Sequence, residues 1–488
     1  MGIDCKWRGH AGQQGAVQQG AAQQALRRGR AHLRALRRMG ARVLLVAGLA
    51  GLGACGGGGD SAGGATPEPG CSVREQQDWL AGYMNDWYFW YRLSPRPDPA
   101  AYADVAGYFE ALLYTGSDPN FPADRWSGRE STASFTRFYA DGENLGYGVS
   151  VAGLEVAGQA GQPLYVRGVD PGSPAAAAGL QRGDRVLSMN GRAAADIVGA
   201  NDFSALTAAD AGQVLNLRVE RGLAVLDLRL VAAVYAITPV TGSRVFTSTA
   251  GRRVGYLAVK NMISQALSPI DQAFAAFKAQ QVQDLVLDLR YNGGGLVSVG
   301  GNLASRVAGL AVGGNTYATL LYNDRRGAAN NQTFPFESPA NSLALSRVFV
   351  LTGPRTCSAS EQLINGLRGA GVQVLSVGDT TCGKPVGFLP ASRCGQTYSV
   401  VNFESVNARN EGRYWDGFDA TCQVPENFQV AQGAADDPLL AASARLADGG
   451  SCPALAQSGP LAGRKAALGA RRLGRGWPLD ERSDMLAK

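Results

Sequence analysis

Histidine is almost missing from this chain of 488 residues. The two that exist, His10 and His32, both lie within the first 54 residues. Imidazole is the usual base beside a serine or cysteine nucleophile, and it is a frequent zinc ligand. A mature protein without residues 1–54 therefore has neither a Ser-His-Asp arrangement nor a histidine-containing zinc site, and a cysteine peptidase that relies on histidine is excluded as well.

The N-terminal part also lacks an apolar run long enough to span a bilayer, which takes about 20 residues. The run at 43–52 follows Arg42 and ends in the small residues of "LGAC" at 52–55. A basic flank, a short apolar stretch and small residues are typical of a secretory signal. "LGAC" also resembles the lipobox of bacterial lipoproteins, which implies that Cys55 is lipidated and becomes the first mature residue.

We therefore expect residues 1–54 to be a presequence that starts at Met1 or at Met39. Residues 55–71 are expected to be a lipidated tether, because the Gly/Ser-rich stretch "GGGGDSAGG" is flexible. The expected location is the bacterial cell envelope, with the lipid in the outer membrane and the protein facing the periplasm. The alternative is an ordinary cleaved signal peptide in which Cys55 has no role.

The chain has almost no net charge once the presequence is set aside. The whole chain has a formal net charge of +6, but 37 basic and 39 acidic residues remain after residue 54. The basic character thus belongs to the presequence. We expect no nucleic-acid partner, because such partners call for a basic surface.

Six cysteines follow Cys55, and none of them forms a C-x-x-C pair. They are Cys71, Cys357, Cys382, Cys394, Cys422 and Cys452. An even number in an exported chain predicts three disulfides rather than a zinc site. Fifteen pairings are possible, and these residues alone do not choose among them. We expect no metal and no cofactor.

Residues 72–140 are predicted to be an N-terminal helical region. Trp79, Tyr83, Trp87 and Trp90 recur at spacings of three and four, which is the period of one helix face. Such an aromatic stripe favours a core position over a ligand site.

Residues 141–235 change to short strands with glycine turns, one small helix at 174–179 and a hairpin. This segment resembles a PDZ domain. "LGYG" at 145–148 matches the carboxylate-binding loop of that family, which implies that Leu145, Gly146, Tyr147 and Gly148 bind a peptide end. PDZ domains take extended peptides by strand addition. The alternative is a PDZ-like module that serves as a scaffold.

Residues 236–447 alternate strands with helices, which predicts a layered α/β core. The expected strands are at 254–262, 282–290, 347–353 and 372–379, with helices at 268–280 and 360–368. From 448 to 488 the chain is rich in Gly, Ala and Arg, and we expect a mobile tail.

The segment "TCSASE" at 356–361 has a structural and a functional interpretation. Ser358 followed by Glu361 before an apolar run is a capping box, which needs no function. Two other segments favour function. "NGGG" at 292–295 follows a strand and lets backbone amides approach a ligand closely, as an oxyanion hole requires. Lys384 lies in a Gly-flanked loop after another strand.

Together, "YLAVKNM", "DLVLDLRYNGGG", "TGPRTCSASEQLINGL" and "VLSVGDTTCGKPVGF" resemble the core of the carboxyl-terminal processing (tail-specific) serine peptidases. The resemblance implies a crotonase-like β-β-α catalytic core with an inserted PDZ domain. It also implies Ser358 as nucleophile, Lys384 as general base, and amides of Gly294, Gly295 and Ala359 around the oxyanion. A dyad of this kind needs no histidine, but it needs a lysine pKa lowered by burial.

The chain departs from that family in two respects. Ser358 and Lys384 are separated by 26 residues, one more than is usual in the family. Phe388 stands where many members have a glutamine that positions the lysine, so the third residue of the site is unassigned. The resemblance also implies that Cys357 and Cys382 are close when the dyad forms. We expect these two to pair, and Cys394 to pair with Cys422.

The predicted function is a lipid-anchored serine endopeptidase that cuts polypeptides recruited by their C-terminal ends through the PDZ domain. Its reaction would pass through an acyl-enzyme. The first alternative is a non-catalytic peptide-binding lipoprotein that keeps the fold. The second is a crotonase-type acyl-thioester enzyme, which the PDZ segment and the Ser/Lys pair disfavour.

Lipidation at Cys55 predicts where the protein fractionates. Cys55→Ser removes the thiol that would carry the lipid, so the variant should leave the membrane fraction and appear in the soluble fraction of lysed cells. Immunoblotting of the two fractions measures this. A Cys55→Ser variant that stays with the membranes would contradict the lipid anchor.

Overall fold

The computed structural model describes residues 69–454 and 484–487. The presequence, Cys55 and most of the tether and tail predicted above lie outside the described residues. Within the described part of the chain, no helix combines the length and apolar character needed to cross a membrane.

The first described region is mostly helical, with α2 (Val73–Trp87), α3 (Val105–Leu112) and α4 (Thr132–Thr136). Helix α2 begins at Ser72, whose backbone N–H donates to Glu75 in a capping box. Its aromatic stripe packs inward. Trp79 stacks on Tyr83, with ring centroids 5.4 Å apart, and both pack against the main core. Trp79, Tyr83 and Trp90 of the stripe therefore belong to or pack against the core, whereas Trp87 is only partly buried.

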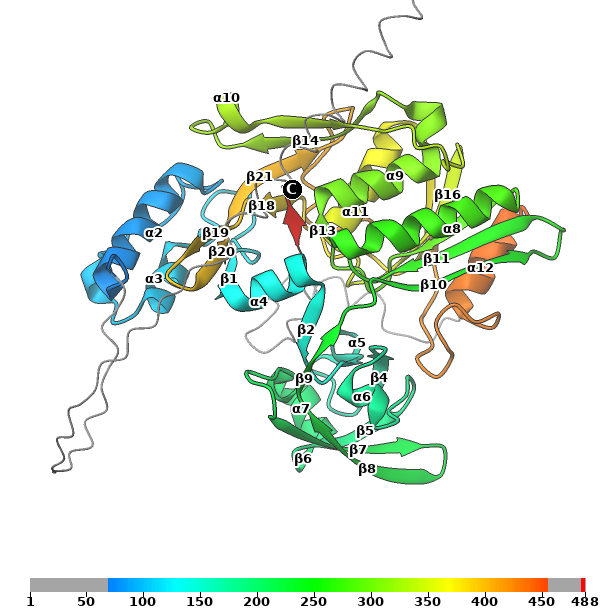
Figure 1. Ribbon diagram of the computed structural model, residues 1–488, viewed down its shortest axis with the longest axis horizontal. Coiled ribbons are helices and arrows are strands. Elements are labelled where there is room, and N and C mark those ends of the chain that lie inside the picture. Colours follow the sequence, from blue (N-terminus) through cyan, green and yellow to red (C-terminus); the bar gives the residue numbers. More distant parts are fainter. Residues whose placement is uncertain (1–68, 455–483, 488) are drawn as a thin grey trace, which may run out of the picture. The chain divides into compact units, whose positions relative to one another are not determined.

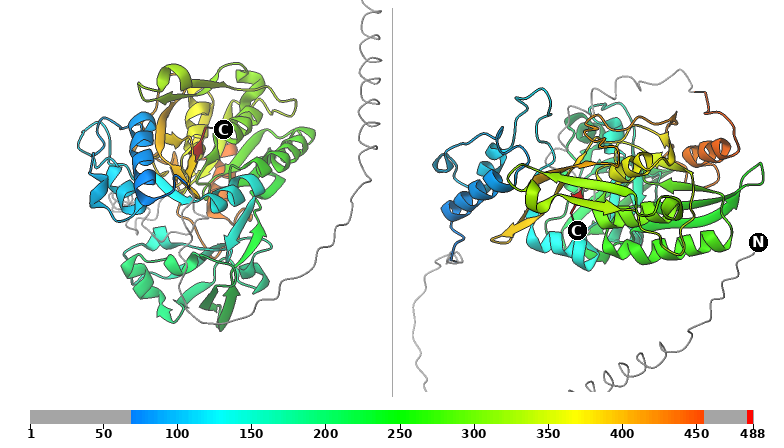
Figure 2. Two further views of the ribbon diagram at one scale, coloured as in Figure 1. Left: turned by 60° about the vertical axis from the view of Figure 1, so that its left-hand side comes forward. Right: turned by 90° about the horizontal axis from the view of Figure 1, so that it is seen from above.

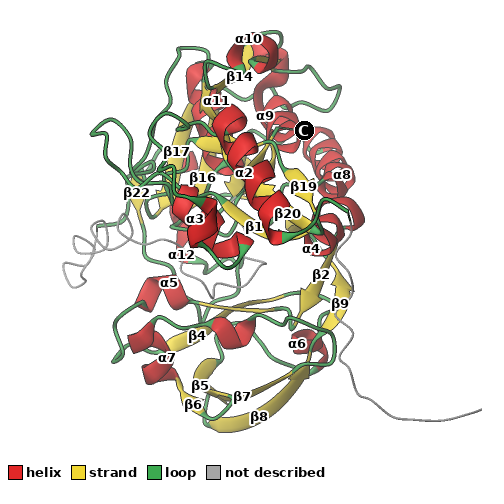
Figure 3. Cartoon of the chain, turned by 90° about the vertical axis from the view of Figure 1, so that its left-hand side faces the viewer, coloured by secondary structure: helices red, strands yellow, loops and turns green. Residues whose placement is uncertain are grey.

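The PDZ segment has a hydrophobic core of its own. Strands β2 (Glu143–Gly146) and β9 (Ala233–Ala236) pair where the chain enters and leaves it (Figure 3). Its sheet is ordered β3-β4-β5-β7-β8, with β6 paired to β5, so β3 lies at an edge. The elements are β3 (Val149–Val151), β4 (Leu164–Val169), β5 (Arg185–Met189), β6 (Arg192–Ala193), β7 (Val214–Arg221), β8 (Ala224–Val231), α5 (Gly153–Val156), α6 (Pro174–Ala177) and α7 (Ala194–Ala200).

The α/β region contains a sheet ordered β10-β11-β12-β16-β17-β22, parallel except for β10. Its strands are β10 (Val240–Thr247), β11 (Arg253–Val259), β12 (Asp284–Asp288), β16 (Arg347–Thr352), β17 (Gln373–Gly378) and β22 (Cys422–Gln423). Successive side chains of a strand point to opposite faces. Leu257 accordingly joins the main core, whereas Tyr256 and Ala258 pack in a second cluster with Leu439 and Leu440.

Helices cover both faces of this sheet. The main-core side carries α8 (Leu267–Ala279), α9 (Val297–Val312) and α11 (Ala359–Gly369), and the opposite side carries α12 (Pro438–Ala447) (Figures 1 and 2). Because both faces are covered, the central strands of the sheet are buried, as in β12, whose five residues are all buried and include Asp284 and Asp288 at its two ends.

A second sheet is ordered β13-β23-β18-β21-β14-β15. Its strands are β13 (Gly295–Leu296), β14 (Thr316–Tyr322), β15 (Gln332–Pro335), β18 (Val386–Phe388), β21 (Val401–Val406) and β23 (Met485–Leu486). A short helix, α10 (Gly327–Asn330), joins β14 to β15. A third, small sheet is formed by β1 (Gly128–Ser131), β19 (Ala391–Arg393) and β20 (Gln396–Ser399).

Strand β23 corrects one prediction. The segment 448–488 was expected to be a mobile tail, but Met485 and Leu486 pair with β13 and β18 and are fully buried. The prediction is wrong at residues 484–487, because the apolar side chains of Met485 and Leu486 are buried in the second sheet.

The disulfides correct a second prediction, the pairing of the cysteines. Cys357 pairs with Cys382, but Cys71 pairs with Cys394 and Cys422 pairs with Cys452. The expected Cys394–Cys422 bond does not form, because the two residues lie in different sheets. Cys394 lies between β19 and β20 of the small third sheet, next to the start of α2. Cys422 lies in β22, at the edge of the sheet that begins with β10.

Candidate active site

Three loops of the candidate site follow three neighbouring parallel strands. The glycine loop follows β12, the serine loop follows β16 and the lysine loop follows β17. The carboxyl ends of parallel strands lie at one edge of a sheet, where binding sites of α/β proteins commonly form. The topology thus brings together segments that are far apart in the sequence.

Ser358 lies at the sharp turn from the serine loop into α11. Its backbone has φ 61° and ψ −117°, a strained conformation for a residue other than glycine. The side chain is fully buried, and its Oγ has no hydrogen-bond partner among the described residues. A buried hydroxyl without a partner costs free energy, and such groups are frequent at functional sites.

Ser360, the other serine of "SASE", is in a different state. Its Oγ donates to the backbone and side-chain oxygens of Asn292, at 3.0 and 2.9 Å. Ser360 therefore has a structural bond to the glycine loop, and the contrast favours Ser358 as the nucleophile.

The glycine loop needs glycine. Gly294 and Gly295 have φ of 106° and 135°, and a Cβ on Gly294 would collide with surrounding backbone, including the Ala359 nitrogen at 2.8 Å. Asn292 holds the loop in place, because its side chain accepts from the Gly294 N–H at 2.8 Å and donates to the Val259 carbonyl at 2.9 Å. The two glycines and Ala359 are therefore next to each other.

Lys384 is buried, with 1% of its surface exposed. Burial disfavours its charged form and lowers the pKa of Lys384 to about 8, while the carboxylates of Asp484, Asp124 and Glu361 oppose this shift. The ammonium lies 4.0 Å from the ring centre of Phe388. The residue that replaces the family's usual glutamine thus packs against the lysine through its aromatic face.

Glu361 joins the serine and lysine loops, a role that sequence reasoning missed. Its fully buried carboxylate accepts from the backbone N–H groups of Ser358 (2.9 Å), Gly383 (2.8 Å) and Lys384 (2.8 Å) and from the hydroxyl of Thr381 (2.5 Å). Burial raises the pKa of Glu361, and these hydrogen bonds oppose the rise. The capping-box spacing in the sequence predicted the hydrogen bond between Glu361 and Ser358, but it did not predict the contacts of Glu361 with the lysine loop.

A covalent bond joins the same two loops. The Cys357–Cys382 disulfide brings the Cα atoms of its residues to 5.2 Å, with Ser358 next to one end and Lys384 two residues from the other. These sulfurs lie close to the Glu361 carboxylate in a grouping of metal-ligand type. As disulfide sulfurs they provide no thiolate, which is the form that binds zinc.

The predicted PDZ loop joins β2 to β3. Leu145 and Gly146 end β2, and Tyr147 and Gly148 form the turn into the edge strand β3. The four residues line a small pocket together with Leu206 to Ala208 and Tyr235.

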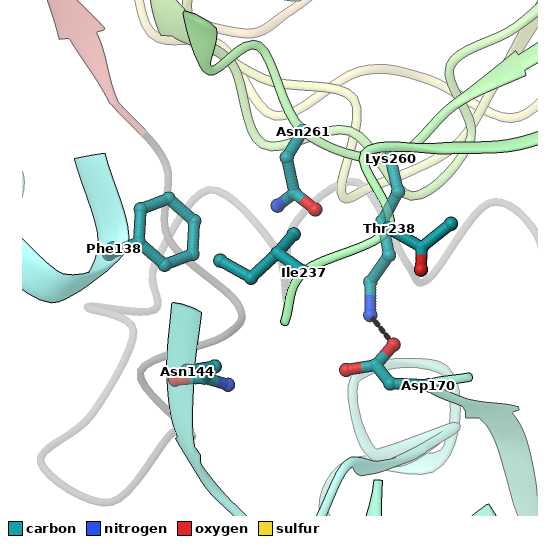
Figure 4. Close-up of a pocket in the computed structure, with 7 residues that line it drawn as sticks. All are labelled: Phe138, Asn144, Asp170, Ile237, Thr238, Lys260 and Asn261. Atoms are coloured by element: carbon teal, nitrogen blue, oxygen red, sulfur yellow. Dashed lines mark hydrogen bonds and ion pairs between the residues drawn. The ribbon is translucent and has the colours of Figure 1, made fainter. Parts of the chain in front are cut away.

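Polar contacts connect the PDZ segment to the α/β region at two places. Lys260, just after β11, points at Asp170, just after β4, and forms an ion pair with it (Figure 4). Arg355, in the serine loop, forms an ion pair with Glu155 of α5 and donates to the Val151 carbonyl of β3 at 3.4 Å. The second contact links the edge strand of the PDZ segment to the loop that carries Ser358.

Comparison with known proteins places these segments in known families. Models of the peptidase family S41, of the PDZ domain and of the S41 N-terminal domain match residues 253–392, 165–221 and 75–128, respectively. Residues 253–392 thus match a peptidase family S41 domain, called the S41 domain below. The matched S41 region includes the glycine, serine and lysine loops, and the order of N-terminal domain, PDZ domain and peptidase domain is the one predicted.

Curated relatives of this chain include carboxyl-terminal processing proteases. A chloroplastic C-terminal processing peptidase of Tetradesmus obliquus is 28% identical over 250 residues, which are 48% of this chain and 51% of the relative. The chloroplastic carboxyl-terminal-processing peptidase 3 of Arabidopsis thaliana is 29% identical over 305 residues, 59% of this chain and 54% of the relative. The chain thus spans about half the length of the curated relatives it matches.

The fold agrees with a solved structure from Bacteroides fragilis described as an S41 protease. The two superpose with a TM-score of 0.60 at 24% identity, over 76% of this chain and 97% of that one. This likeness supports the mixed α/β fold of the S41 domain together with its PDZ domain.

The four donors around Glu361 predict the effect of removing its charge. Glu361→Gln has one acceptor oxygen, so at least two buried donors lose their partner, at about 1–3 kcal/mol each. The free energy of unfolding, measured with urea, should therefore be lower than that of the wild-type protein by roughly the sum of these costs. The exposed Glu337→Gln is the matched control and should change it by less than about 0.5 kcal/mol. Equal stability of the two variants would contradict the role of Glu361.

Proposed function

We propose that this S41 domain is a serine endopeptidase with Ser358 as nucleophile and Lys384 as general base. The observation that carries the proposal is the pairing of a buried, unbonded serine hydroxyl with a buried lysine whose pKa is lowered to about 8, on two loops that share Glu361. A lysine with such a pKa is partly neutral near neutral pH and can then accept a proton.

In the proposed reaction, neutral Lys384 takes the proton of Ser358 Oγ while the oxygen attacks a peptide carbonyl carbon. The N–H groups of Gly295 and Ala359 stabilise the resulting oxyanion, and the positive end of α11 adds to this stabilisation. The C–N bond breaks, the leaving amine receives the proton from Lys384, and an acyl-enzyme remains. Water then hydrolyses the ester, with Lys384 as the base.

We propose that the PDZ domain recruits polypeptides by their C-terminal ends. Strand β3 lies at the edge of the PDZ sheet in the described part of the chain, where a further strand can add, and the turn at Tyr147 and Gly148 precedes it, as a carboxylate-binding loop does. The Arg355 contacts with α5 and β3 give the recruited peptide a physical connection to the serine loop.

Two further parts of the proposal concern location and the rival function. We propose that Cys55 anchors the protein to the envelope by a lipid, so that the peptidase domain faces the periplasm.

The rival function is peptide binding without catalysis. The unbonded hydroxyl of Ser358 and the burial of Lys384 favour the enzyme, because both cost free energy that a purely binding protein need not spend.

Removing either member of the dyad should abolish cleavage. Ser358→Ala and Lys384→Ala are expected to lower kcat/KM on an unstructured polypeptide with an apolar C-terminus by at least about a thousandfold, since nucleophile and base act as one unit. Lys278→Ala, which removes an exposed lysine, is the matched control and should retain full activity. Product formation is followed by mass spectrometry.

Two results would contradict this proposal. If wild-type protein cleaves no unstructured polypeptide, or if both dyad variants cleave as well as wild type does, the peptide-binding function is favoured. A fluorophosphonate that labels Ser360 instead of Ser358 would show that the other serine is the nucleophile.

A further inference from the structure

The end of the chain occupies the candidate active site. Strand β23, the red arrow in Figure 1, lies between β13 of the glycine loop and β18, which follows the lysine loop, and is parallel to both. The Gly295 N–H donates to the Asp484 carbonyl at 2.5 Å, and the Ala487 N–H donates to the Phe388 carbonyl at 3.1 Å. The segment is thus bound by backbone pairing, as an extended peptide substrate would be.

The carbonyl oxygen of Asp484 is bound at the glycine loop. It accepts from Gly295, one of the two amides assigned to the oxyanion. A Cβ built on Gly294 would contact both this carbonyl oxygen and the Ala359 nitrogen, so the oxygen and the second amide lie beside the same atom. Ala359 directly follows Ser358. The peptide bond next in line is the one between Asp484 and Met485.

Side chains on both sides of this bond are also held. The hydroxyl of Tyr139 donates to the Asp484 carboxylate, which also interacts electrostatically with Lys384. Met485 and Leu486 are 0% and 1% exposed and belong to the main core. The cleft therefore fits an acidic residue before the bond and two apolar residues after it.

We propose that the chain's own C-terminal end is a substrate of this site, cut between Asp484 and Met485. The inference rests on the proposed peptidase function. Ser358 Oγ bonds to the carbonyl carbon of Asp484, and the Asp484–Met485 C–N bond breaks. The new amine of Met485 takes the serine's proton by way of Lys384, and Met485–Lys488 leaves as a tetrapeptide. One water then hydrolyses the ester and leaves a chain that ends at Asp484.

The cut also clears the site for other polypeptides. Before it, β23 fills the space between β13 and β18 that another extended peptide would need. After it, the four released residues are no longer tethered to the chain, and their dissociation opens the cleft. Self-processing therefore precedes the cleavage of other chains.

Intact-mass spectrometry of the purified full chain tests the proposal. Wild-type protein should end at Asp484, and Ser358→Ala, which retains the tail but not the nucleophile, should end at Lys488. Leu486→Asp places a charge where an apolar side chain is buried, so it should also keep Lys488, whereas the conservative Leu486→Met should be processed. Circular dichroism of each variant identifies any that fails to fold.

An assay on an unstructured polypeptide separates this inference from the function on which it rests. If wild-type protein cleaves that polypeptide but keeps its own Lys488, the tail is not a substrate and the inference is wrong. A deletion of 485–488 that then raises the rate would identify the tail as an inhibitor instead. If wild-type protein cleaves neither chain, both the inference and the proposed peptidase function are wrong.

Discussion

Four donors from two loops converge on the buried carboxylate of Glu361, and the geometry of the candidate site depends on this contact. One oxygen accepts from Ser358 and Lys384, so the backbones of the proposed nucleophile and base are fixed by the same atom. A carboxylate that is buried away from solvent must have all its hydrogen bonds satisfied. Loss of any one of the four donors would therefore destabilise the whole arrangement. The negative charge favours the protonated lysine, but burial has the larger effect on the pKa of Lys384.

The two sheets contribute different parts of the candidate site. The parallel sheet delivers the glycine, serine and lysine loops at one edge, because β12, β16 and β17 are neighbours that run in the same direction. The second sheet provides the strands between which an extended peptide pairs, as β23 does. The serine loop also touches the PDZ domain through Arg355, so a short segment of chain before Ser358 links the proposed nucleophile to the domain proposed to recruit peptides.

Local patterns were enough to predict the α/β fold with its PDZ and N-terminal domains, and the S41 matches and the solved structure confirm it. Ser358, Lys384 and the glycine pair were found because each lies in a short motif, and their roles stay predictions. Contacts between distant segments had no such signal. The capping spacing of Glu361 did not reveal the lysine loop, the pairing of Cys71 with Cys394 spans 323 residues, and Met485 and Leu486 are too short an apolar stretch to predict a buried strand.

The pH dependence of kcat/KM on an unstructured polypeptide tests the central claim, that a buried lysine serves as the base of Ser358. Lys384 can accept a proton only when neutral, so the rate should rise with pH and level off, with a midpoint near or below 8. Burial lowers the pKa of Lys384, whereas the carboxylates of Asp484, Asp124 and Glu361 raise it by a smaller amount. A profile that is flat between about pH 6 and 9, or a midpoint near the ordinary lysine pKa of about 10.4, would contradict the account.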